Sequence, residues 1–68
     1  MNEEALNTSV RKFLKTLGVT AQREIEKAVR EAASSGRLKD GQPLPAKAVV
    51  TVSAIGLSFE VDGRIETR

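Results

Sequence analysis

Three carboxylates near the C-terminal end have the spacing that best suits a chemical role. Glu60, Asp62 and Glu66 stand at positions i, i+2 and i+6 of a stretch with strand-like alternation. Alternate residues of a strand point to the same side of a sheet, so these carboxylates could hold a hard cation such as Mg²⁺ or Ca²⁺. The favoured interpretation is a solvated outer face with Lys47 and Arg64 as neighbours, and we expect no metal site.

Other kinds of catalytic or binding site find little support in the composition. The sequence contains neither histidine nor cysteine, which removes the usual nucleophile–base pairs, disulfides and zinc sites. It has no GxxxxGK phosphate loop, and the spacing around Asp40-Gly41 matches no calcium loop. A chain of 68 residues also lacks the deep core in which a pocket forms. We therefore expect no enzymatic activity, no cofactor and no small-molecule substrate.

Basic residues of the N-terminal half could instead contact nucleic acid. The candidates are Arg11, Lys12, Lys15, Arg23, Lys27 and Arg30. However, the net charge is only +2, from 11 basic and 9 acidic residues, and Glu24, Glu26 and Glu31 flank the basic positions. Trp and Tyr are absent, so aromatic platforms for stacking bases are missing. We expect a solvated, salt-bridged surface and keep weak nucleic-acid binding as the alternative function.

The elements that position these side chains begin with a helix predicted over residues 2–17. Its apolar residues form one stripe at helical spacing: Leu6, Val10, Phe13, Leu14 and Leu17. Asn2 is the predicted N-cap. Gly18 is expected to end the helix in the left-handed conformation common after a last helical turn.

A second helix is predicted over residues 21–35, with Thr20 as its N-cap and Gly36 as its stop signal. Its apolar face is rich in alanine: Ala21, Ile25, Ala28, Val29, Ala32 and Ala33. The stretch LGVTAQREIEKAV would then contain the turn that joins two packed helices. A DNA-reading helix-turn-helix is disfavoured, because Glu24 and Lys27 stand where that motif buries apolar side chains.

The period of the sequence changes to two after a loop predicted over residues 36–44, which favours a hairpin of 45–54 with 57–66. A turn centred on Ile55-Gly56 keeps all apolar residues on one face and pairs Val52 with Phe59. A turn at Asp62-Gly63 is the better local hairpin signal but would mix the faces. Gly63 is then expected to be a bulge or a site of close backbone approach. A short third strand after it remains an alternative.

Together these elements predict one domain over residues 1–68, an α+β fold with two helices packed on one face of a long antiparallel hairpin (ααββ). Such a hairpin is thin and leaves strand edges open. Val49, Thr51 and Ile55 mark the candidate interaction edge, for a second copy or for another protein's strand. We expect a small non-enzymatic interaction or accessory module that acts as a small homo-oligomer.

Membrane insertion and secretion are not expected. No apolar run approaches the roughly 20 residues that span a bilayer, and the start MNEEALNTSV is unlike a secretory signal. We expect a cytoplasmic protein.

Several stretches resemble a family of short, mainly proteobacterial proteins of unknown function. They are MNEEALNTSVRKFLKTLGVTAQREIEKAVREA, LPAK at 44–47 and EVDGRIE near the end. The resemblance covers nearly the whole chain and implies a small helix–helix–hairpin domain. It implies no activity, cofactor or catalytic residue.

Overall fold

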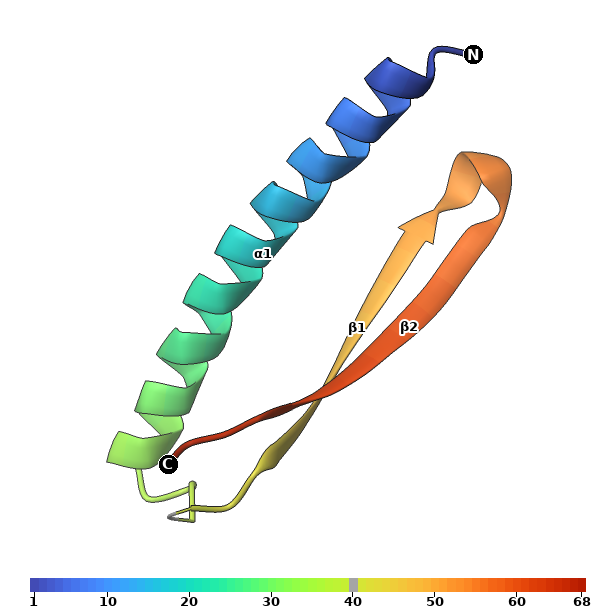
Figure 1. Ribbon diagram of the computed structural model, residues 1–68. Coiled ribbons are helices and arrows are strands. Elements are labelled where there is room, and N and C mark those ends of the chain that lie inside the picture. Colours follow the sequence, from blue (N-terminus) through green and yellow to red (C-terminus); the bar gives the residue numbers. More distant parts are fainter. Residues whose placement is uncertain (40) are drawn as a thin grey trace. The chain divides into compact units, whose positions relative to one another are not determined.

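The computed structural model describes residues 1–39 and 41–68; Asp40, in the predicted loop, lies outside the described residues. The elements in chain order are α1 (Glu3–Ser34), β1 (Leu44–Val52), the short 3-10 helix η1 (Ser53–Ile55) and β2 (Leu57–Ile65) (Figure 1). The chain divides into two compact units, Met1–Leu38 and Lys39–Arg68. The first unit is a helix and the second is a hairpin.

The N-terminal unit holds one helix of 32 residues, so the prediction of two helices, and with it the ααββ architecture, is wrong. Gly18 and Thr20, the expected stop and N-cap, both lie inside α1. Gly18 is not among the glycines with a positive φ. The fold is α+β with a single helix and a hairpin.

The continuity of α1 follows from the phase of its apolar residues. Leu6, Leu17 and Ala28 are spaced by eleven residues, and so are Val10 and Ala21. Eleven residues make about three helical turns, so one straight helix keeps both series on the same side. One glycine in a helix interior costs only about 1 kcal/mol relative to alanine, which is too little to interrupt the pattern.

The ends of α1 are where the sequence predicts them. The side-chain oxygen of Asn2 accepts a hydrogen bond from the Ala5 amide at 3.1 Å, which confirms Asn2 as the N-cap. At the other end Gly36 has a φ of 77°, and the Arg37 amide donates to the Ala32 carbonyl at 2.9 Å. This left-handed glycine with a returning hydrogen bond is a Schellman C-cap, so the stop signal at Gly36 is confirmed.

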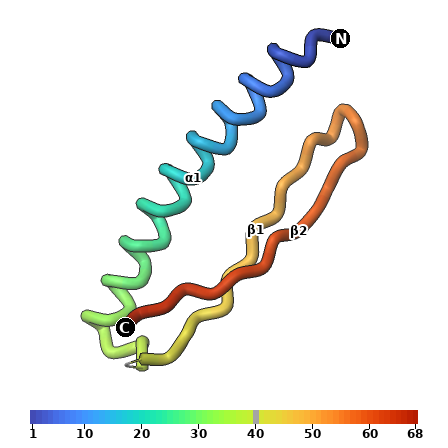
Figure 2. The backbone as a smooth tube through the Cα atoms, viewed as in Figure 1, coloured from blue at the N-terminus to red at the C-terminus, as the bar shows by residue number. Residues whose placement is uncertain are grey.

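The C-terminal unit is a two-stranded antiparallel sheet, twisted along its length (Figure 2). Val50 pairs with Phe59, and Val52 pairs with Leu57. The predicted pairing of Val52 with Phe59 is therefore wrong by two residues. Because a shift of two preserves the alternation of sides, the predicted single apolar face is confirmed.

The register shift comes from the turn. Four residues, Ser53 to Gly56, join the strands, and the Gly56 amide donates to the Ser53 carbonyl at 3.1 Å. Gly56 has a φ of 69°. A two-residue hairpin at Ile55-Gly56 would need either Ile55 at positive φ or a turn that splays the strands. The four-residue loop needs a positive φ only at Gly56. It therefore avoids both a positive φ at Ile55 and the splaying of the strands.

β2 runs unbroken through Asp62-Gly63, and in the described residues no third strand follows it. Gly63 pairs with Ala46 inside the regular ladder, so the predicted bulge at Gly63 is wrong. A Cβ added at Gly63 would meet nothing within 4 Å, so the backbone makes no close approach there either.

Each unit is a single layer. A lone helix or a lone two-stranded sheet has no second layer against which to bury its apolar side. Within each unit, none of the described side chains is buried.

Candidate interaction surfaces

The first candidate surface is an apolar stripe along α1, here called the α1 stripe. It consists of Leu6, Val10, Phe13, Leu14, Leu17, Ala21, Ile25, Ala28 and Ala32. These positions recur every three or four residues and so share one side of the helix. The largest of them, Phe13, is 54% exposed.

The second candidate surface is the apolar side of the hairpin, here called the hairpin face. It consists of Leu44, Ala46, Ala48, Val50 and Val52 on β1 with Leu57, Phe59, Val61, Gly63 and Ile65 on β2. The directly opposed pair Val50–Phe59 sets a β-branched side chain against an aromatic one, a pairing that stabilises a sheet. Phe59 and Ile65 are six positions apart on an unbroken strand and therefore point to the same side.

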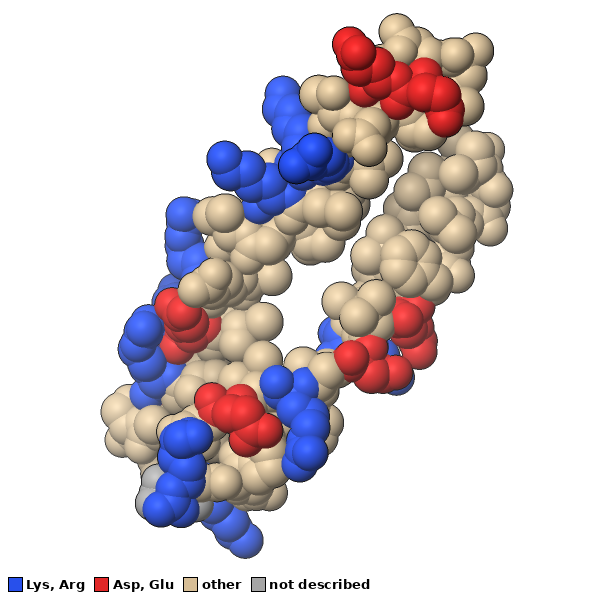
Figure 3. Space-filling view, viewed as in Figure 1, with Lys and Arg blue, Asp and Glu red and all other residues tan. Residues whose placement is uncertain are grey.

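The predicted basic patch lies on a single helix rather than on two. Arg11, Lys12, Lys15, Arg23, Lys27 and Arg30 all fall within α1. At about 100° per residue they occupy the half of the helix surface opposite the α1 stripe. We call this surface the basic face. Figure 3 shows the basic groups along the helix, with acidic groups at its N-terminal end and among the basic groups further on.

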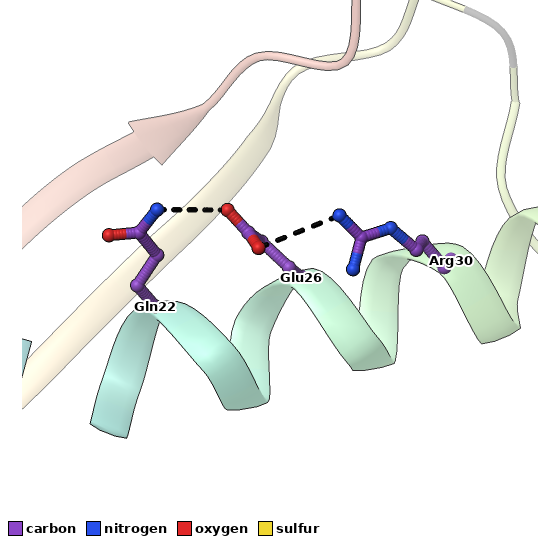
Figure 4. Close-up of polar contacts among 3 residues, drawn as sticks. All are labelled: Gln22, Glu26 and Arg30. Carbon is purple, nitrogen blue, oxygen red and sulfur yellow. Dashed lines mark hydrogen bonds and ion pairs between the residues drawn. The ribbon is translucent and has the colours of Figure 1, made fainter. Parts of the chain in front are cut away.

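The acidic group within the basic face is Glu26. Its carboxylate lies 3.5 Å from the Arg30 guanidinium and accepts a hydrogen bond of 3.0 Å from the Gln22 side-chain amide (Figure 4). Both partners are one helical turn away, the spacing that favours such pairs. Glu26 therefore neutralises the C-terminal part of the basic face, whereas between Ala5 and Arg23 the helix carries basic charges alone.

The predicted interaction edge is exposed. Val49 and Thr51 lie on the side of β1 opposite the hairpin face. Ile55, in η1 at the tip of the hairpin, is 74% exposed. Because the sheet has two strands, the outer edge of each is unpaired within the described residues.

The structure does not bring Glu60, Asp62 and Glu66 together as one cluster of ligands. Lys47 lies opposite Asp62, and its ammonium is 3.6 Å from the Glu60 carboxylate. Glu66 lies beyond the end of β2. Among the described residues no group of three acidic, His or Cys side chains is placed to hold a metal ion. The carboxylates belong instead to an exposed polar side that Lys47 partly neutralises.

None of the helices in the described part of the chain is long and apolar enough to cross a membrane.

The uninterrupted length of the α1 stripe is a feature that the sequence prediction lacks, because two helices divided at Gly18 place its apolar positions on separate faces. The eleven-residue spacing from Leu6 to Leu17 to Ala28 was the signal that joins them, because two helices meeting at an elbow have no reason to keep a common phase.

No curated protein and no solved structure matches this chain. A family model does match, over residues 1–68, and it confirms the resemblance to a family of unknown function. The chain therefore belongs to a family of unknown function, DUF6494.

Proposed function

We propose that this protein is a non-enzymatic interaction module that self-associates through its apolar surfaces. One observation carries the proposal: the helix unit has an apolar stripe and the hairpin unit has an apolar face, and neither unit by itself buries its apolar side. Contiguous exposed apolar surface of this kind marks interaction sites in soluble proteins. Small chains without disulfides or structural metals commonly reach stability by oligomerisation.

The areas of the two surfaces suit a dimer. The α1 stripe runs from Leu6 to Ala32, about 39 Å at 1.5 Å per residue and about 10 Å wide, which gives about 400 Å². The nine-residue strands give a hairpin face of about 30 Å by about 10 Å, or about 300 Å². Two chains that contribute both surfaces would bury about 1,400 Å², within the range of about 1,200–2,000 Å² for specific interfaces.

The test is the oligomeric state of two matched variants of the full chain. Val61 lies on the hairpin face and is 54% exposed, whereas Val49 lies on the opposite side and is 59% exposed. Both are valines in paired strands, so the variants V61K and V49K differ mainly in the side that receives the charge. Sedimentation across the micromolar range should show dimers or larger oligomers for the unmodified chain and for V49K, and dissociation for V61K.

A clean monomer of the unmodified chain at every concentration would overturn the proposal. So would equal dissociation of V61K and V49K, because the hairpin face would then contribute no more than the polar side.

A second candidate function, nucleic-acid binding, is favoured by one observation. The continuity of α1 gathers on one helix side the basic residues that two helices could have held apart. Phosphate binding by lysine and arginine weakens steeply with salt, with a slope of about −0.9 per contact on duplex DNA.

The expected result for this second function is measurable salt-sensitive binding of a DNA duplex. The double variant K12Q/K15Q should reduce the salt slope by about 2, whereas K47Q on the hairpin should leave it unchanged. Absence of duplex binding at low salt would exclude this function.

A further inference from the structure

Large and small side chains are distributed unevenly along the α1 stripe. Its N-terminal half carries the bulk: Leu6, Val10, Phe13, Leu14 and Leu17. Its C-terminal half consists of Ala21, Ala28 and Ala32 with the single large residue Ile25. A second copy of α1 has the same uneven distribution of side-chain size. The direction in which it runs therefore determines whether its large side chains meet small ones.

The positions of the stripe are also symmetric about Val19. Leu6 and Ala32 lie thirteen residues to either side of Val19, and Val10 and Ala28 lie nine. Phe13 and Ile25 lie six residues away, and Leu17 and Ala21 lie two. The exception is Leu14, whose counterpart is the acidic residue Glu24. Two copies of α1 that run in opposite directions, centred on Val19, would therefore bring stripe positions level with stripe positions.

Three of these four pairs place a larger side chain against alanine, and the fourth sets Phe13 level with the partner's Ile25. Leu6 would face the partner's Ala32, Val10 would face the partner's Ala28, and Leu17 would face the partner's Ala21. Interfaces pack well when facing layers alternate in size. Parallel helices would instead set leucine against leucine at one end and alanine against alanine at the other. One helix–helix distance of about 8–10 Å cannot suit both ends.

We propose that two copies of this chain pair through α1 in antiparallel orientation, with a two-fold axis at Val19. This inference rests on the proposed self-association and specifies its geometry. Such an interface is isologous, so every contact from Val10 to the partner's Ala28 is repeated from Ala28 to the partner's Val10.

The absence of cysteine from the sequence makes a clean cross-linking test available. Full-length V10C and A28C chains are prepared separately, mixed in equal amounts under reducing conditions and then oxidised. A disulfide requires Cβ atoms about 3.5–4.5 Å apart, a distance that only a mixed antiparallel dimer offers to these positions. Random exchange makes about half of the dimers mixed, so a covalent dimer of V10C with A28C should form in about half of the dimer population.

Each variant alone should stay uncross-linked, because its two cysteines would lie about 27 Å apart along the pair. V19C is the matched control: Val19 is level with the partner's Val19 but lies two and a half turns from Val10, on the opposite helix side. It should not cross-link. The pair L6C and A32C repeats the test should V10C or A28C weaken association.

The outcomes separate the two proposals. Covalent dimers of V10C alone, or a sedimenting dimer in which neither mixed pair cross-links, would overturn the antiparallel pairing and leave self-association standing. A monomer in sedimentation would overturn both. Cross-linking of V19C as fast as that of the mixed pairs would show collisional oxidation and would contradict the proposed interface.

Discussion

Replacing Gly18 with alanine tests the continuity of α1 through the sign of its effect on stability. Gly18 lies in the helix interior without a positive φ, and an added Cβ would meet nothing within 4 Å. Alanine then gains helix propensity at no steric cost, which raises the free energy of unfolding by about 0.5–1 kcal/mol. For a domain of this size the midpoint of thermal unfolding should rise by about 2–8 °C.

The matched control is Gly36→Ala. An added Cβ at Gly36 also meets nothing within 4 Å, but Gly36 has a φ of +77°. The left-handed conformation costs a residue with a Cβ about 1–2 kcal/mol, so G36A should lower the midpoint. Both variants are measured by circular dichroism at one fixed protein concentration, because association shifts the apparent stability. If G18A lowers the midpoint as G36A does, Gly18 ends a helix and the continuous α1 stripe is refuted.

Three further changes have outcomes set by local structure. Asn2→Ala removes the hydrogen bond to the Ala5 amide and should cost about 1 kcal/mol, with faster hydrogen exchange in the first helical turn as the measurement. Gly56→Ala forces an alanine to a φ of +69° and should cost about 1–2 kcal/mol in urea unfolding. Glu26→Gln removes the exposed pair with Arg30 and should change stability by less than about 0.5 kcal/mol; a larger loss would mean that this pair is not solvent-screened.

The helix ends were predictable because each is determined by a local interaction. Asn2 provides an acceptor for a free amide, and Gly36 adopts a conformation that other residues avoid. Gly18 is the same residue type as Gly36 but lies within an uninterrupted apolar phase. Whether a glycine ends a helix depends on the residues beyond it, and the pattern from Leu17 to Ala21 and Ile25 already indicated that the helix continues.

The hairpin was predictable in its faces but not in its register. Alternation from Leu44 to Val52 and from Leu57 to Ile65 determines which side chains share a side. A register shift of two leaves that alternation unchanged. The register depends on the loop length, and the loop length depends on which residues can adopt a positive φ. The apolar pattern carries no information about the cost of a positive φ, so it does not determine the register.

For the candidate site, the sequence predicts which residues lie on the surface but not what those residues bind. The carboxylates and basic residues are exposed, and an exposed charged side chain has no surrounding geometry that assigns it a role. The α1 stripe became visible as one surface only when Gly18 was placed inside the helix. Its symmetry about Val19 depends on that continuity and could not be recognised in two separate helices.

Isotope-filtered nuclear Overhauser spectroscopy on a mixture of ¹³C-labelled and unlabelled chains tests the central claim most directly. It detects contacts between chains and suppresses those within one chain. Antiparallel pairing through the α1 stripe predicts contacts between the methyl groups of Leu6 in one chain and Ala32 in another. The account would be contradicted by a spectrum that shows no contact between chains at a concentration where the α1 stripe and the hairpin face are both shielded from solvent.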